Sequence, residues 1–308
     1  MPRFRFVDRP AAEPEWKAVH RAADRGIPAL RGPFLDAVQS LQDNVSVTDM
    51  EVLISQGGAA AVVGALPWFR FESDLTNAFL PAFKDTQHRA MRGVLGILED
   101  DTPADQIILT KQHITARFDL TNPQSVAVAA RQAAEAVQQI SASTKRAIRE
   151  IIRRGQLGLL TVREQARKIR DLIGLTERQT GSVLNFERKL IEQGITGQQL
   201  ESMVLRKFEQ TLSRRATTIA RTETIKSANL GQQNLWRQAA DQGLIDRDKA
   251  QRRWIATSDD RVCPICAPMD GQLRPLEEPF VSPFNGASAS VPGIHAACRC
   301  AVALEVAA

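Results

Sequence analysis

The sequence predicts an α+β protein that is mostly α, with an elongated helical body followed by a small β-hairpin module at the C-terminal end. Three observations lead to this class. Helix-start signals and glycine stops recur between residues 121 and 245. After Gly243 the chain changes to short β-favouring runs separated by prolines and glycines. All four cysteines lie between residues 263 and 300, inside that last part.

Length and composition are ordinary for a soluble globular protein. The chain has 308 residues, of which 43% are hydrophobic and 24% charged, enough to bury a sizeable core in more than one domain. We expect three regions. These are an N-terminal arm and helical region (1–120), a helical array with basic character (121–245) and a C-terminal module (246–308).

The sequence predicts neither a secreted protein nor a membrane-spanning protein. Residues 1–16 contain no apolar stretch of the kind that marks a secretory signal. The longest apolar run, Gly57–Phe69, is too short and too rich in glycine and proline to cross a bilayer, which takes roughly 20 residues. We therefore expect no membrane contact and a cytosolic setting, where clustered cysteines favour a metal over disulfides.

The N-terminal third reads as an arm followed by helices. Residues 1–31 carry scattered prolines and glycines and predict an extended arm with at most one short helix. Residues 33–99 have helical patterning, and Pro81 is expected to kink or divide the last of these helices. The run at residues 106–118 fits either a helix or a strand.

The array that follows has clear helix boundaries. Thr121-Asn122-Pro123 is a helix start, and Thr161 and Thr176 each precede a Glu or Gln three residues later, which is the capping-box pattern. Glycines close the segments, and Gly231 is expected to bend the last one. The predicted helices cover residues 123–154, 161–174, 176–194 and 196–243.

Charge is unevenly distributed. The chain has a net charge of +5, but residues 145–237 contain 19 Lys and Arg against 9 Asp and Glu, so this stretch carries +10 and the remainder −5. Such a basic region favours a polyanion or an acidic partner surface, although a solvated face of long helices fits the same pattern.

The C-terminal module combines strand signals with metal-ligand spacing. A β-favouring run starts at Trp254, and Asp270-Gly271 predicts a hairpin turn into a second strand. A Pro- and Gly-rich loop covers residues 275–294, and a short strand is expected to close the module after residue 300.

The cysteines form two close pairs with a histidine beside one of them. Cys263 and Cys266 form a CxxC, and His295 and Cys298 form an HxxC, with 28 residues between Cys266 and His295. Two such pairs suit a closed, four-coordinate Zn²⁺ site that stabilises a small module without catalysing a reaction. Cys300 is the alternative fourth ligand, but we expect the side chains of Cys298 and Cys300 to point to opposite faces of a strand, which favours His295 and Cys298.

Two other interpretations of the cysteines remain open. A catalytic zinc of the deaminase type would need an upstream His/Cys-x-Glu motif, and no histidine of this chain supplies one. A disulfide, or no metal at all, is the remaining alternative.

A second polar cluster precedes the module. Arg221, Thr222 and Glu223 lie in one predicted helix, and Arg221 and Glu223 are the residues around which an enzyme would be built. The absence of a nearby histidine favours a structural role, such as packing of the helix against the zinc module.

These motifs, in order, resemble a known family. The series ARTET and AN.G on a helix, W.ATSDDRVCPIC..MDG, and then P..H..CRC is similar to the phage Mu F-like head morphogenesis proteins, over roughly Gln156 to Ala303. Members are minor capsid proteins of tailed double-stranded DNA phages and prophages, associated with the portal vertex and the packaged genome. The resemblance assigns Cys263, Cys266, His295 and Cys298 to the metal or structural motif.

The resemblance implies a non-enzymatic virion component. The expected partners are portal and capsid proteins, and the protein is expected to assemble in multiple copies. The expected location is the head interior or the portal vertex of the virion, and the host cytoplasm during assembly. The basic region is then expected to face double-stranded DNA through phosphate contacts that do not depend on sequence. The candidate contact residues are Arg214, Arg215, Arg221, Arg252, Arg253 and Arg261.

Two alternatives belong to other functional classes. The first is a zinc-containing nucleic-acid-binding protein of the host cell, in which Arg299 joins the arginines of the module on a phosphate-binding surface. The second is an effector enzyme, such as a nuclease or ADP-ribosyl transferase, that uses Arg221 and Glu223.

Overall fold

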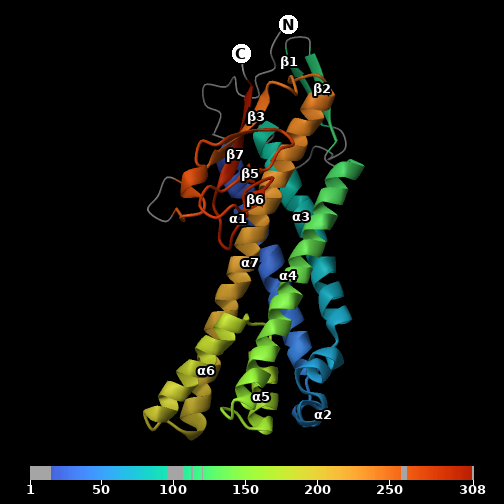
Figure 1. Cartoon of the computed structure of the whole chain (residues 1–308). Helices are drawn as coiled ribbons and strands as arrows, with labels where there is room; N and C mark the ends of the chain where they lie inside the picture. The colour runs from blue at the N-terminus through green and yellow to red at the C-terminus, as the bar shows by residue number, and fades with distance from the viewer. Residues whose placement is uncertain (1–14, 96–106, 112–113, 120, 258–261, 307–308) are drawn as a thin grey trace. The chain divides into compact units, whose positions relative to one another are not determined.

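The computed structural model describes residues 15–95, 107–111, 114–119, 121–257 and 262–306, and it is mainly helical with a few short antiparallel strands (Figure 1). This confirms the predicted class. The helices are α1 (Glu15–Asp43), α2 (Val47–Ala65), α3 (Trp68–Leu95), α4 (Pro123–Gln156), α5 (Val162–Leu172), α6 (Glu177–Glu192) and α7 (Gly197–Asp241). The strands are β1 (Ile107–Lys111), β2 (Ile114–Phe118), β3 (Ala250–Ile255), β4 (Leu273–Pro275), β5 (Phe280–Val281), β6 (Ser288–Ala289) and β7 (Ala301–Val306).

The described chain divides into two compact units. The first contains the residues up to Ala29, Phe79–Ala133 and the residues from Thr218 onward, and the second contains Leu30–Ala78 and Ala134–Thr217. The boundaries fall inside helices α1, α3, α4 and α7. The three regions expected from the sequence stay a prediction.

Helix α1 extends further toward the N-terminus than the sequence predicted. Residues 15–31 belong to this helix, although an extended arm with at most one short helix was expected there; residues 1–14 lie outside the described part. Pro28 and Pro33 each remove one backbone donor. Apolar residues at helical spacing, among them Val19 and Phe34, are fully buried, and their burial outweighs the two prolines.

The second unit is built from helices whose starts the sequence predicted correctly. Thr161 and Glu164 form a complete capping box before α5, and Thr176 and Gln179 form another before α6. Each hydroxyl accepts from the backbone N–H three residues on, and the Glu or Gln side chain accepts from the N–H of the threonine. These boundaries are set by residues within four positions, which explains why sequence alone finds them.

Arg215 is a buried arginine in the core of the second unit. Its guanidinium donates to the Gly174 carbonyl and to Ser143 Oγ, and it lies over the Phe34 ring at 5.5 Å. Burial lowers its pKa to about 10, so the group stays charged at neutral pH. Gly174 has φ 95°, and a Cβ there would lie 2.5 Å from the Val38 side chain.

Helix α2 is apolar but little buried. Within the described residues one stretch, Val47–Leu95, is long and apolar enough by composition to cross a membrane, with mean hydropathy 1.5 and 11% of the tested window buried. This stretch is two helices, α2 and α3, separated at Leu66 and Pro67, and α2 departs from helical geometry at Gly58. Length and composition alone do not assign it to a bilayer.

Two residues expected to interrupt helices lie inside them. Pro81 sits within α3, which continues on both sides of it. Gly231 lies within α7, and a Cβ at this position would meet the Gln87 carbonyl oxygen of α3 at 2.6 Å. Gly231 is therefore a point of close helix–helix approach in the first unit and does not end the helix.

The first unit contains the C-terminal sheet and its core. Strand β3 is central, with β4 and β7 antiparallel on either side, and β5 pairs with β6 in the loop that follows β4. Trp236 of α7 and Trp254 of β3 are fully buried in one apolar cluster, and the Trp254 ring packs edge-on against Phe280 at 5.2 Å. This confirms the predicted hairpin and closing strand. The run before α4, for which the sequence fits either a helix or a strand, forms a second hairpin from β1 and β2.

Candidate metal centre

Two turns carry the cysteines and the histidine to one place in the first unit. Cys263 and Cys266 lie on the turn after β3, where the Cys266 N–H donates to the Cys263 carbonyl at 3.1 Å. His295 and Cys298 lie on the turn before β7, closed by a bond from the Cys298 N–H to the His295 carbonyl at 3.2 Å. The predicted ligand pairs are therefore both on tight turns, and the sheet brings the turns together.

The donor atoms of the two turns lie close together. His295 Nε2 lies 3.0 Å from Cys263 Sγ and 3.0 Å from Cys266 Sγ, and the Cys266 and Cys298 sulfurs are 4.0 Å apart. Zn–S bonds of about 2.3 Å and Zn–N bonds of about 2.0 Å in a tetrahedron place donor atoms roughly 3.5–3.8 Å apart. The donor types therefore suit Zn²⁺; the sulfur–sulfur distance is close to this spacing, and the two sulfur–nitrogen distances are shorter than it.

The tautomer of His295 also suits a metal. Its Nδ1 lies 2.9 Å from the Ala296 carbonyl oxygen, which can only accept a hydrogen bond. Nδ1 therefore carries a proton, and Nε2, on the other side of the ring, faces the sulfurs of the two CxxC cysteines. A ligand histidine that donates its other N–H to a carbonyl is the usual outer-sphere arrangement around zinc.

Cys300 lies closer to the cluster than the sequence argument assumed. The expectation that Cys298 and Cys300 point to opposite faces was wrong: the two residues precede β7, and side chains two residues apart on a strand would in any case share one face. Cys266, Cys298 and Cys300 are all buried, with their sulfurs within 4.8 Å of one another. The structure thus offers five donors for four positions, in two groups that share Cys266.

The thiols already favour one ionised sulfur. The hydrogen bond between Cys266 and Cys298 lowers the pKa of the Cys298 thiol and raises that of Cys266, so that the pair shares one proton. The hydrogen bond with Cys298 raises the pKa of His295 to about 9. Thiolate is the form that binds metal, and metal binding would displace the remaining protons.

Helix α7 holds the second ligand turn at two points. Thr222 Oγ1 accepts from the Ala297 N–H at 2.8 Å, between the histidine and the first cysteine of that turn, where Ala297 has φ 58°. Asn229, which is fully buried, donates to the Cys300 carbonyl at 3.3 Å and accepts from the Val302 N–H at 3.1 Å. Thr222 and Asn229 of α7 therefore hold the second ligand turn in position.

The other two members of that helix cluster differ in exposure. Arg221 is exposed. Gln132 of α4 donates to the Glu223 carbonyl at 2.8 Å and to its carboxylate at 3.3 Å. Glu223 thus helps to join α7 to α4 within the first unit.

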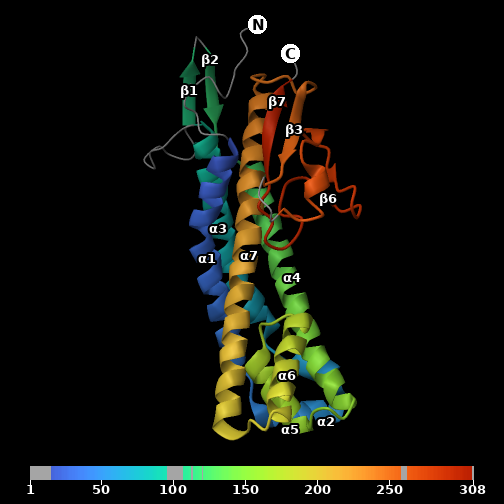
Figure 2. The same ribbon diagram turned by 90° about the vertical axis from the view of Figure 1, so that its left-hand side faces the viewer.

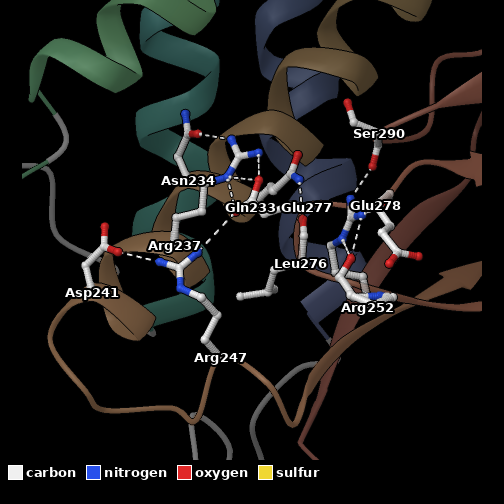
Figure 3. A network of polar contacts seen from close by, with 11 residues as sticks. Gln233, Asn234, Arg237, Asp241, Arg247, Arg252, Leu276, Glu277, Glu278 and Ser290 are labelled. Carbon is white, nitrogen blue, oxygen red and sulfur yellow. Dashed lines mark hydrogen bonds and ion pairs between the residues drawn. The ribbon is translucent and has the colours of Figure 1, made fainter.

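Arg252 is fully buried, and Figure 3 shows the polar contacts of its guanidinium. Its guanidinium donates to the carbonyls of Pro275, Glu278 and Ser290 and lies 5.0 Å from the centre of the Phe280 ring. Burial lowers its pKa to about 10, which leaves it charged at neutral pH. One side chain thereby fixes three points of the long loop after β4.

A second group of contacts, which we call the second clamp, joins the same loop to α7 through Arg237, Arg247 and Glu277. Arg237 makes a bidentate ion pair with Glu277 at 2.6 and 3.0 Å, and Arg247 approaches the same carboxylate at 3.4 Å (Figure 3). Gln233, one turn before Arg237, donates to the Leu276 carbonyl at 3.0 Å. The sequence analysis missed this clamp; the signal was two long polar side chains four residues apart on a helix.

The predicted contact arginines are in different environments. Arg214 and Arg221 are exposed, and Arg253 is half exposed and paired with Glu305 at 2.6 Å. Arg215 and Arg252 are buried with their donors on carbonyl and hydroxyl oxygens, so neither can reach a phosphate. Arg261 lies outside the described residues.

Comparison with known proteins identifies the segment that carries this centre. Residues 182–303 match the family model described as Phage Mu protein F like protein. Over this segment the chain is similar to the phage Mu F-like proteins, as the order of its motifs predicted. Neither the curated proteins nor the solved structures contain a match to the chain.

Proposed function

We propose that the protein is a non-enzymatic minor capsid and head morphogenesis component of a tailed double-stranded DNA phage or prophage. The observation that carries this is the family match over residues 182–303, which spans α7 and the whole of the Cys/His module. The match covers both ligand turns and the helix that holds them, so it covers the part of the chain with the most specific geometry.

The proposed metal is one structural Zn²⁺ held by Cys263, Cys266, His295 and Cys298, with Cys300 as the alternative to His295. Bound zinc would supply four strong bonds that tie the two turns together, since a closed set of four protein ligands leaves no position for water or substrate. The chain's own contribution is the convergence of the donors, which Thr222 and Asn229 support through backbone bonds.

The structural contacts of Thr222 and Glu223 support the non-enzymatic assignment. Thr222 accepts from the ligand turn and Glu223 accepts from Gln132, so both side chains have structural partners. The competing proposal, an effector enzyme built on Arg221 and Glu223, predicts a turnover that depends on that carboxylate. Nuclease and ADP-ribosyl transferase assays on the wild type and on Glu223→Gln separate the two, since activity lost only in the variant would support the enzyme.

The proposed setting is the virion, at the portal vertex or in the head interior, after assembly in the host cytoplasm. Portal and capsid proteins are the proposed partners, with several copies of the chain per particle, and packaged DNA is a further contact. The decisive experiment is purification of assembled heads followed by protein identification and metal analysis. We expect the protein in mature heads with one zinc per copy; its absence from heads would contradict the proposal.

A further inference from the structure

We propose that a basic groove on helix α6 in the second unit binds the phosphate backbone of DNA. The groove has a volume of about 490 Å³. It is lined by Arg178, Gly181, Ser182, Asn185, Phe186, Lys189 and Lys207, none of which is acidic. This inference rests on the proposed DNA contact and assigns it a site that the sequence analysis did not name.

The lining residues of α6 form one helical stripe. Arg178, Ser182, Asn185 and Lys189 follow one another at intervals of three or four residues, which places them on one face. Thr180, Val183, Leu184 and Leu190 are buried on the opposite side of the helix. The core therefore does not use this stripe, and its polar and basic residues face outward.

The flanking helices complete the groove within the same unit. Arg154 of α4 donates to Asn185 Oδ1 at 3.0 Å, which leaves the Asn185 amide hydrogens free to donate. On the other flank the ammonium group of Lys207 lies 5.8 Å from the centre of the Phe186 ring. Gly181 keeps the floor open, since a Cβ there would lie 3.2 Å from Arg154 Nη2.

The cations of the groove differ from most others in the second unit. Within the described residues, Arg178, Lys189 and Lys207 have no ion pair with a carboxylate, whereas Arg188, one residue before Lys189, pairs with Glu192 at 3.8 Å. Cations without an ion pair, in a groove that no acidic residue lines, create a positive potential that attracts an anion.

The spacing of the cations favours a linear polyanion. Arg178 and Lys189 are separated along the helix by roughly 16 Å, at about 1.5 Å per residue, too far to share a single phosphate. Duplex DNA carries about one charge per 1.7 Å of its axis, so a row of cations of this length meets several phosphates. The Ser182 hydroxyl and the Asn185 amide add neutral donors for phosphate oxygens between them.

The test uses the zinc-loaded full chain and a fluorescent 20-base-pair duplex. The groove variant Arg178→Gln/Lys189→Gln/Lys207→Gln is compared with the control Arg163→Gln/Arg170→Gln/Arg188→Gln, which removes three ion-paired cations of the same unit. We expect the groove variant to lose about tenfold or more in affinity, and its log–log salt slope to fall by about 3. The control should stay within about threefold of the wild type.

Equal affinity losses in the two variants would overturn the groove while leaving a general DNA contact in place. Polyglutamate and inorganic phosphate serve as competing ligands. If polyglutamate of equal charge displaced the duplex fully at the same concentration, the groove would be a docking site for an acidic protein. If inorganic phosphate bound alone at micromolar concentration, it would be a single-phosphate site. A wild type that fails to bind DNA would remove both this inference and the DNA contact, whereas the head-protein assignment depends on the particle analysis.

Discussion

The C-terminal module and the α6 groove are both rich in cations, but they use them in opposite ways. In the module, Arg252 is buried against carbonyls, and Arg253 is paired with a carboxylate. In the groove, Arg178 and Lys189 are exposed and carry no ion pair within the described residues. Positive charge in the module therefore maintains a shape, and positive charge in the groove is available to a ligand. The following predictions test this contrast, from the largest expected effect to the smallest.

Loss of the metal centre should have the largest effect. Structural zinc contributes about 10–16 kcal/mol to folding in small zinc-binding peptides, comparable to the whole stability of a domain. We expect Cys266→Ser, which removes the donor shared by both groups, to abolish zinc binding and the near-ultraviolet circular dichroism of Trp254. The α6 groove should retain its affinity for DNA.

Cys300→Ser is the matched control. If His295 is the fourth ligand, this variant keeps one zinc per chain, and His295→Ala loses most of its affinity. The reverse result would assign Cys300 to the metal and contradict the proposed ligand set. Metal content by mass spectrometry of the native protein distinguishes the two.

The next effect concerns the buried arginine of the module. Arg252→Met leaves the carbonyls of Pro275, Glu278 and Ser290 without their donor, and each buried unsatisfied acceptor costs about 1–3 kcal/mol. We expect the free energy of unfolding in urea to fall by about 3 kcal/mol or more. Arg253→Met, on the adjacent and exposed position, should cost less than about 1 kcal/mol. Similar costs for the two variants would contradict the shape-holding role.

A smaller effect is expected where α7 supports the ligand turn. Thr222→Val removes the acceptor of the Ala297 N–H, and outer-sphere changes typically weaken metal binding about 10–100-fold. We expect about a tenfold loss in zinc affinity, measured by chelator competition. Thr211→Val, whose hydroxyl donates only to the Lys207 carbonyl of its own helix, should leave zinc affinity unchanged. An unchanged affinity in Thr222→Val would show that the turn needs no support from α7.

The smallest effect is a pH dependence at the second clamp. The hydrogen bond from Arg237 lowers the pKa of Glu277 below its ordinary value of 4.5. A lowered pKa in the folded protein means that the pair stabilises the fold above pH 4.5 and that this contribution is lost as the pH falls through the folded pKa. The carboxylate is half exposed, so the effect is about 1 kcal/mol or less. The stability difference between wild type and Glu277→Gln should shrink on acidification; a difference that is constant from pH 7 to pH 3 would contradict it.

The sequence predicts best those features that neighbouring residues decide. The capping boxes at Thr161 and Thr176 depend on contacts three residues apart, and the CxxC and HxxC pairs each occupy one turn. All of them are where the sequence places them. Whether His295 or Cys300 is the fourth ligand depends on the path of the chain before β7, and local sequence patterns do not determine that path.

Features that depend on distant partners were harder to predict. The close approach of Gly231 to α3 cannot be read from α7 alone, and the predicted bend at Gly231 stays a prediction. Arg252 was expected on the surface because arginine is rarely buried, yet β3 alternates, and Arg252 shares the inward face with Ala250 and Trp254. That alternation was a usable signal. For the groove, the signal was a stripe of α6 without aliphatic residues opposite its apolar face.

Hydrogen exchange on the full chain compares the two regions most directly, with DNA and a zinc chelator as separate perturbations. We predict that a short duplex slows exchange in residues 177–210 and leaves residues 250–306 unchanged. We predict that chelation speeds exchange in residues 250–306 and leaves α6 unchanged. Protection of the module by DNA, or loss of protection in α6 on chelation, would contradict the division between cations that hold a shape and cations that bind a ligand.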